Sequence, residues 1–125
     1  MSTQELKPGT SYPAVVGSVL VKLRCERNVL QGDLAEAVGV TQATWSRIEN
    51  GSSALTIEQI ALAAGRLGVS PHSILSYADE AAEELRQRGV RVELTRNSLS
   101  LESGIALIGA AALGALIATI IFKAK

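Results

Sequence analysis

The sequence predicts an all-α protein in which five short helices form one domain, a strand-like connector follows, and a single transmembrane helix ends the chain. Three observations support this fold class. Apolar residues recur at spacings of three and four through the first two thirds of the chain, which is the period of a helix packed on one side. Polar residues and prolines stand where helices begin, as in Ser70-Pro71. Residues 104–122 carry no charge.

Length and composition limit the chain to one small domain with an appendage. It has 125 residues, and single domains mostly contain about 100–200. Twelve basic and twelve acidic side chains give a net charge of +0, which favours neither nucleic acid nor an acidic surface as a general partner. The single cysteine, Cys25, excludes an internal disulfide framework, and the single histidine, His72, excludes a zinc site built of Cys and His alone. We therefore expect a reduced environment, no metal and no cofactor.

Residues 1–12 are predicted to be a flexible arm, because they are polar and contain the helix breakers Pro8 and Gly9. The domain predicted over residues 13–88 begins with a helix whose apolar face is formed by Val16, Leu20 and Leu23. A second helix is expected over residues 31–38. Gly39 should end it, since glycine adopts the positive φ of a helix C-terminus at no steric cost.

Capping patterns predict the three helices that follow. Thr41 can cap a helix over residues 42–49, in which Trp45 and Ile48 would face the core. The sequence "TIEQ" at residues 56–59 is a capping box, in which the Thr and Gln side chains satisfy each other's backbone donors, and it predicts the start of a fourth helix. Ser70-Pro71 predicts the start of a fifth helix that continues to Gly89.

The second and third helices, joined through "VGVT", predict a helix-turn-helix. The segments "LRCERNVLQGDLAEAVGVTQATWSRIENG" and "LTIEQIALAAGRLGVSPHSIL" resemble the lambda-repressor-like, XRE-type helix-turn-helix family over roughly residues 19–75. This resemblance implies a five-helix domain that binds operator DNA as a homodimer. The positions that match the family's spacing are Arg24, Gln31, Leu34, Ala35, Gly39, Ile48, Glu49, Gly51 and the segment "LGVS".

The resemblance also implies which side chains contact DNA. The third helix would face the major groove, where Gln42 could bond adenine edges, Arg47 could reach guanine or phosphate, and Ala43 could meet a thymine methyl. Gln31, at the start of the second helix, and Asn50 would bind phosphates. The complete set of implied DNA contacts is Gln31, Thr41, Gln42, Ala43, Thr44, Ser46, Arg47 and Asn50.

Several positions have a structural interpretation instead. Arg24 and Glu49 match a pair that joins the first and third helices in the family, so we expect them to be structural. Leu30 stands where the family usually has a capping serine or threonine, and Trp45 replaces a smaller aliphatic residue but is still interpreted as core. The alternative for residues 41–47 is a solvated face on a domain that binds protein instead of DNA.

Charge limits the DNA affinity expected of one copy. Residues 12–75 contain five basic and five acidic side chains, and phosphate neutralisation supplies most non-specific affinity. We therefore expect a homodimer that reads two half-sites. The basic residues are Lys22, Arg24, Arg27, Arg47 and Arg66, and the acidic ones are Glu26, Asp33, Glu36, Glu49 and Glu58.

Residues 89–103 are predicted to be a strand-like connector and linker. "VRVELT" alternates apolar and polar residues, which is typical of a half-buried strand. A single strand needs a partner strand. One hypothesis is that it pairs with the same strand of a second copy, and the other is that these residues are an extended linker whose alternation is accidental. The serine-rich "RNSLSLES" suits a flexible tether.

Residues 104–122 are predicted to form the transmembrane helix, followed by a short tail over residues 123–125. Nineteen uncharged residues would rise about 28 Å as a helix, close to the ~30 Å hydrocarbon core of a bilayer. The competing interpretation is a helix buried inside an oligomer. Small residues at every fourth position would let two spans approach closely, namely Ala106, Ala110, Gly114 and Ala118.

Together these features predict a single-pass protein of the bacterial inner membrane, bacterial or phage-derived, with its N-terminal domain in the cytoplasm. Its predicted function is transcription regulation through DNA binding by residues 42–49. The predicted partners are double-stranded DNA, the lipid bilayer, a second copy and, as a further option, another membrane protein. The alternatives are an anchored scaffold that binds a protein partner and a tether that holds DNA at the membrane. An enzyme is not expected, since no nucleophile-base pair or phosphate-binding glycine loop is present.

Overall fold

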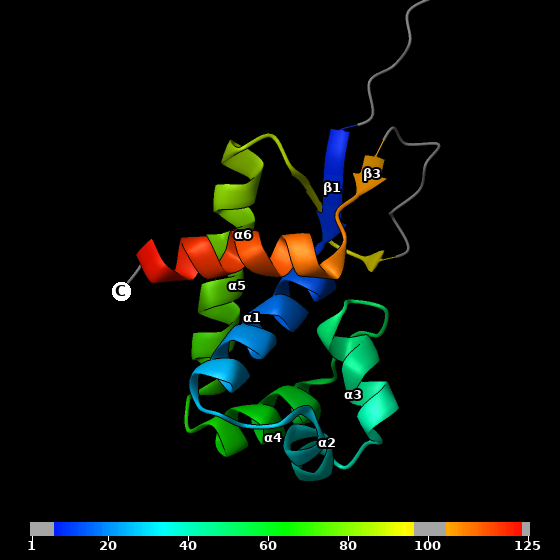
Figure 1. Ribbon diagram of the computed structural model, residues 1–125, viewed down its shortest axis with the longest axis vertical. Helices are drawn as coiled ribbons and strands as arrows, with labels where there is room; N and C mark the ends of the chain where they lie inside the picture. The colour runs from blue at the N-terminus through cyan, green and yellow to red at the C-terminus, as the bar shows by residue number, and fades with distance from the viewer. Residues whose placement is uncertain (1–6, 97–104, 124–125) are drawn as a thin grey trace, which may run out of the picture.

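The computed structural model describes residues 7–96 and 105–123, which form six helices and three short strands (Figure 1). The first five helices follow one another with short connections, the third and fifth pack on the first, and the sixth crosses the first. The helices are α1 (Tyr12–Glu26), α2 (Gln31–Val38), α3 (Gln42–Glu49), α4 (Ile57–Leu67), α5 (Pro71–Gln87) and α6 (Ala110–Lys123), and the strands are β1 (Lys7–Ser11), β2 (Arg91–Glu93) and β3 (Ile105–Leu107).

Helix starts follow the capping patterns of the sequence. The hydroxyl of Thr41 accepts a hydrogen bond from the backbone N–H of Thr44 at the start of α3, at 3.1 Å. Thr56 and Gln59 form the reciprocal capping box at the start of α4, with distances of 2.9 and 3.1 Å. The Ser70 hydroxyl caps α5. The predicted starts of these three helices are therefore confirmed.

The core is built around α1, whose residues 15–20 are all buried. A helix that is covered on every side needs neighbours all round it. α1 contacts α3, α5, α6 and β1, which together supply that cover. The largest fully buried side chains of the core include Leu20, Leu34, Trp45, Ile48, Ile74, Leu85, Leu113 and Ile117.

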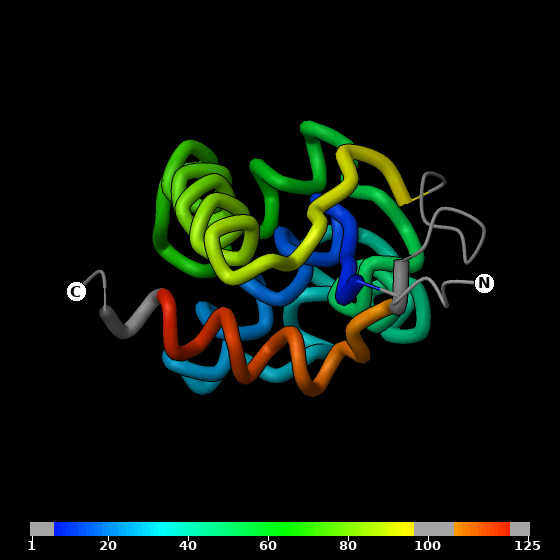
Figure 2. Tube along the Cα trace, turned by 90° about the horizontal axis from the view of Figure 1, so that it is seen from above, coloured from blue at the N-terminus to red at the C-terminus, as the bar shows by residue number. Residues whose placement is uncertain are grey.

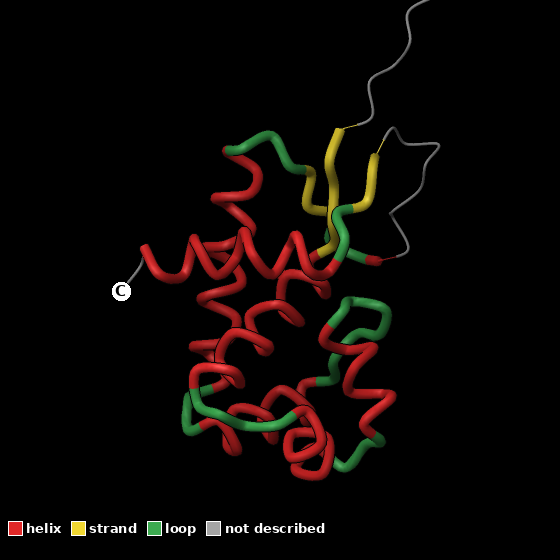
Figure 3. The backbone as a smooth tube through the Cα atoms, in the orientation of Figure 1, coloured by secondary structure: helices red, strands yellow, loops and turns green. Residues whose placement is uncertain are grey.

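A three-stranded parallel sheet lies at one end of the helical body (Figure 3). Its strand order is β2-β1-β3, with Thr10 opposite Val92 and Pro8 opposite Ala106. Residues 7–11, predicted to belong to a flexible arm, are thus a strand, and residues 1–6 lie outside the described residues. β2 pairs with β1 of its own chain, so the hypothesis that it needs a second copy as its partner is wrong. "KPGTS" lacks the alternation that would reveal a strand, and its partners lie far along the chain.

The prediction of a transmembrane helix over residues 104–122 is wrong, and the predicted fold class is wrong in that part, whereas its five short helices are present. Residues 105–107 form β3, and α6 has 14 residues, a rise of about 21 Å against the ~30 Å of a hydrocarbon core. Among the residues that the structure describes, no helix combines the length and the apolar character that crossing a bilayer requires.

α6 packs on protein instead of lipid. It runs along the edge of the molecule across α1 and also contacts α5 (Figures 1 and 2). Leu113, Ile117 and Ile120 are buried in the same core as α1. Of the small residues predicted to join two membrane spans, Ala110 is exposed, while Gly114 and Ala118 are half-buried on α6. The predicted inner-membrane localisation and the lipid partner depended on the span and are contradicted with it.

Candidate nucleic-acid interface

α2 and α3 are joined by a tight turn that sets the direction of α3. Gly39 ends α2 with φ +83°, a conformation that favours glycine. The backbone N–H groups of Gly39 and Val40 both donate to the carbonyl oxygen of Ala35, at 2.9 and 3.0 Å, and close the end of α2. Thr41 then caps α3. The turn therefore fixes where α3 begins relative to α2.

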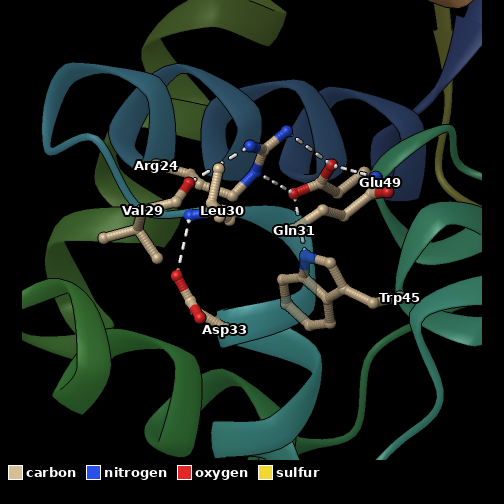
Figure 4. Close-up of polar contacts among 7 residues, drawn as sticks. All are labelled: Arg24, Val29, Leu30, Gln31, Asp33, Trp45 and Glu49. Carbon is tan, nitrogen blue, oxygen red and sulfur yellow. Dashed lines mark hydrogen bonds and ion pairs between the residues drawn. The ribbon is translucent and has the colours of Figure 1, made fainter.

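A buried carboxylate fixes α3 against the two preceding helices (Figure 4). Glu49, at the end of α3, is only 6% exposed. Its oxygens accept hydrogen bonds from Arg24 Nε at 2.8 Å and Arg24 Nη2 at 3.1 Å, both from α1. Gln31 Nε2, from α2, donates to Oε1 at 2.8 Å, and the indole N–H of Trp45 donates to Oε2 at 2.8 Å. We call Arg24, Gln31, Trp45 and Glu49 the Glu49 network.

Arg24 extends this network to the loop between α1 and α2. Its third nitrogen, Nη1, donates to the carbonyl oxygen of Val29 at 3.2 Å. Desolvation by burial lowers the pKa of Arg24, but the hydrogen bond to Glu49 and the charge of that carboxylate outweigh it, so the pKa lies above its ordinary value. The guanidinium is therefore always charged and always able to neutralise Glu49.

The packing of α1 on α3 is unusually close at Gly17. A Cβ atom at Gly17 would lie 2.5 Å from the carbonyl oxygen of Ile48 and also collide with the backbone of Glu49. Only a residue without a side chain allows this approach. The separation of α1 and α3, and hence the length of the Arg24–Glu49 contact, depends on that glycine.

The face of α3 that points away from the core is formed by residues expected to contact DNA. Thr41, Gln42, Ala43 and Arg47 are exposed, and Thr44 and Ser46 are half-buried. Thr44 links two of them, because its hydroxyl accepts from Thr41 Oγ1 at 3.0 Å and from Arg47 Nη2 at 3.4 Å. These bonds hold Thr41 and Arg47 on the same side of the helix.

The two expected DNA contacts that lie outside residues 41–47 also have partners inside the protein. Gln31, half-buried at the start of α2, belongs to the Glu49 network. Asn50 is exposed, and its Oδ1 accepts from the backbone N–H and the hydroxyl of Ser52, at 2.9 and 2.6 Å. Leu30, at the position of a missing cap, is 69% exposed, and Asp33 instead accepts from its backbone N–H at 3.2 Å. Gln31 and Asn50 are thus positioned before any ligand is bound.

The polar role of Trp45 was not foreseen from the sequence. Trp45 is fully buried, in agreement with its interpretation as core, but its indole N–H also bonds Glu49. A buried indole usually needs an acceptor, and Glu49 stands four residues later on the same helix face. That spacing was the available signal. Within residues 7–96 and 105–123, no three His, Cys, Asp or Glu side chains gather as metal ligands would.

Comparisons with known proteins agree with this geometry. The helix-turn-helix family model matches residues 20–74. The matched residues include α2, the tight turn and α3. The clp gene regulator ClgR from Corynebacterium glutamicum is similar to the chain at 28% identity, with a TM-score of 0.54, and the match covers 62% of this chain and 87% of that one.

Two further solved structures are similar to the chain. A second structure of ClgR shares 28% identity over 54% of this chain and 88% of that one, with a TM-score of 0.52. A single-residue mutant of the restriction-modification controller protein C.Esp1396I shares 27% identity over 58% of this chain and 95% of its own length, with a TM-score of 0.54. No curated protein matches the chain in sequence.

Proposed function

We propose that the chain is a DNA-binding transcription regulator that inserts the exposed face of α3 into the major groove. One observation carries the proposal: α3 buries Trp45, Ile48 and Glu49 and turns Gln42 and Arg47 to solvent. An α-helix fits the major groove, where glutamine and arginine side chains read base edges. The similar proteins, a clp gene regulator and a restriction-modification controller, support a regulatory and non-enzymatic role.

Each exposed side chain has a proposed task. Gln42 bonds adenine, Arg47 bonds guanine or phosphate, and Ala43 contacts a thymine methyl. Thr41, Thr44 and Ser46 add hydroxyls along the same face, and Asn50 binds phosphate. Gln31 Nε2 carries two hydrogens and gives one to Glu49, so the other can reach a phosphate beside the N-terminus of α2. The Glu49 network then orients α2 and α3 together.

We also propose that two copies of the chain bind DNA together as a homodimer. Residues 12–75 carry equal numbers of acidic and basic side chains, so one copy neutralises few phosphates and binds weakly. A homodimer doubles the contacts and reads two half-sites about one helical turn apart. Sedimentation of the full chain alone and with DNA measures this directly, and a one-to-one complex on a single half-site would contradict it.

The decisive experiment selects duplexes from a random-sequence 40-base-pair pool with the full chain at low salt, and then titrates the enriched sequence. We expect Gln42→Ala and Arg47→Ala each to weaken binding about 5- to 150-fold, the range that corresponds to 1–3 kcal/mol per base contact. Arg66→Ala is the matched control, because Arg66 is exposed on α4 and its replacement removes the same charge. If no sequence is enriched, or all three variants bind alike, the proposal fails.

A second candidate function is the binding of a protein partner. Two large apolar side chains of α4 are exposed, Ile57 at 86% and Leu62 at 49%. Residues 12–75 also carry as many acidic as basic side chains, so their net charge does not attract a polyanion such as DNA. Exposed apolar residues suit a protein contact. The selection experiment separates the two functions, since a folded protein that binds no duplex leaves this second candidate.

A further inference from the structure

The C-terminal helix lies beside one flank of the proposed DNA interface. Ala110, Ala111 and Gly114, in the first turns of α6, line a surface hollow together with three of the expected DNA contacts, Gln31, Ser46 and Asn50. Arg24 and Glu49 of the Glu49 network line the same hollow. In Figure 1 the start of α6 lies just above the end of α3. One side of α3 therefore has α6 as its neighbour.

The segment before α6 continues along the same flank. Leu107 and Ile108 line a second hollow with Asn50 and Ser52, next to the turn that ends α3. Thr41, Gln42, Ala43 and Arg47 line neither hollow. The interface thus has an open side, at the start and outer face of α3, and a bordered side, at Gln31, Ser46 and Asn50.

The dimensions of DNA make the bordered side important. The major groove is about 12 Å wide and a helix with its side chains is about 10–12 Å across, so the phosphate strands lie directly beside an inserted helix. One strand must follow the side of α3 where Gln31 and Asn50 stand. That path runs through the hollow whose other wall is α6.

We propose that α6 is an autoinhibitory element, which in its docked position blocks the phosphate strand at Gln31, Ser46 and Asn50 and must leave α1 before the domain binds DNA fully. The inference rests on the proposed function. Docking uses apolar contacts, because residues 110–122 carry no charge and Leu113, Ile117 and Ile120 are buried against α1 and α5. If only a minor fraction of the molecules has α6 away from α1, the apparent affinity equals the intrinsic affinity multiplied by that fraction.

Two full-length variants with the same charge change test this inference. Ile117→Asp places a carboxylate in the buried contact of α6, and Thr119→Asp places one on the exposed side of the same helix. Each adds one negative charge, so long-range repulsion from DNA is matched. The probe is the random-sequence duplex pool at low salt, followed by the enriched sequence. We expect Ile117→Asp to bind at least about tenfold more tightly than Thr119→Asp and the unmodified chain.

The gain must also pass through α3. Adding Arg47→Ala to Ile117→Asp should weaken its binding about 5- to 150-fold, as in the unmodified chain. A double variant that binds as tightly as Ile117→Asp would show that the gain does not come from α3 and would overturn the inference. Equal binding by the unmodified chain and both variants would overturn it as well while leaving the proposed function intact. If none of the proteins binds any duplex, the proposed function fails and the inference with it.

Two further measurements apply if Ile117→Asp does not fold. Ile117→Ala loosens the same contact without a charge and should give a smaller gain in affinity. Hydrogen exchange on the unmodified chain reports directly on α6. Saturating DNA should speed amide exchange in residues 113–120, and unchanged or slower exchange there would show that α6 stays docked in the complex, which the inference excludes.

Discussion

Arg24 of α1 and Glu49 of α3 meet through two nearly parallel hydrogen bonds, Nε to Oε2 at 2.8 Å and Nη2 to Oε1 at 3.1 Å. This fork geometry is available to arginine but not to lysine. Gln31 and Trp45 bond the same carboxylate, so one acidic side chain joins three helices. The relative orientation of α1, α2 and α3 therefore depends on a polar cluster inside an otherwise apolar core.

Removal of that carboxylate should be severely destabilising. Glu49→Ala leaves Arg24 charged and the Trp45 indole without its acceptor, and we expect the free energy of unfolding to fall by about 3–5 kcal/mol. Glu84→Ala is the control, because it breaks an exposed pair with Arg88 at 3.2 Å that should contribute less than about 1 kcal/mol. Urea unfolding followed by circular dichroism measures both. Similar losses in the two variants would show that the Glu49 network contributes little.

Replacement by alanine should have opposite effects on stability at two glycines, one in the contact of α1 with α3 and one on the surface of α4. Gly17→Ala forces a methyl group against the backbone of Ile48 and should lower the free energy of unfolding by about 1–3 kcal/mol. Gly65→Ala, on the exposed side of α4 where an added Cβ meets nothing within 4 Å, should raise it by about 0.4–1 kcal/mol. Thermal and urea unfolding give both values. A neutral Gly17→Ala would mean that α1 and α3 can move apart freely.

Two helix-capping residues allow an effect on stability to be distinguished from an effect on DNA affinity. The hydroxyls of Thr41 and Ser70 cap α3 and α5 with bonds of 3.1 and 3.2 Å, so Thr41→Ala and Ser70→Ala should each cost about 1 kcal/mol of stability. Only Thr41 lies on the proposed interface. We expect weaker binding to the selected duplex for Thr41→Ala and unchanged binding for Ser70→Ala. Equal affinities, measured at a temperature where both are folded, would place Thr41 outside the interface.

Tyr12 should make stability fall at alkaline pH. Burial raises the pKa of its phenol, and the hydrogen bond it donates to Asp79 at 2.6 Å, with the charge of that carboxylate, raises it further. The unfolded chain releases this proton near pH 10 and the folded chain only at higher pH, so the contribution is complete below about pH 10 and is lost as pH rises above it. The difference in unfolding free energy between the unmodified chain and Tyr12→Phe should therefore narrow from pH 9 to pH 11. A constant difference would contradict the raised pKa.

The helices of the domain could be predicted because their signals are local. Thr41, Thr56 and Ser70 mark helix starts within three residues of the bonds they make, and Gly39 marks an end. The exposed side of α3 could be predicted because the fixed period of a helix separates Trp45 and Ile48 from Gln42 and Arg47. The bond from Gln31 to Glu49 was missed because it joins different helices.

The C-terminal part was misread for a physical reason. An uncharged apolar run favours any environment without water, and composition alone does not distinguish lipid from the side of another helix. The contrary signal was in α1, where residues 15–20 are an unbroken run of apolar and small side chains, which is typical of a helix covered on every side. Leu113 and Ile117 of α6 supply it.

The position of β1 between β2 and β3 has a consequence for synthesis on the ribosome. β1 is synthesised well before the two strands that flank it, which are residues 91–93 and 105–107. The helical bundle can collapse as soon as α5 has left the exit tunnel, whereas the leading strand waits, with its backbone hydrogen-bonded to water, for the trailing ones. The sheet can therefore be completed only after residue 107 has been synthesised, and a ribosome stalled before residue 105 holds a nascent protein in which β1 still lacks one of its two neighbours.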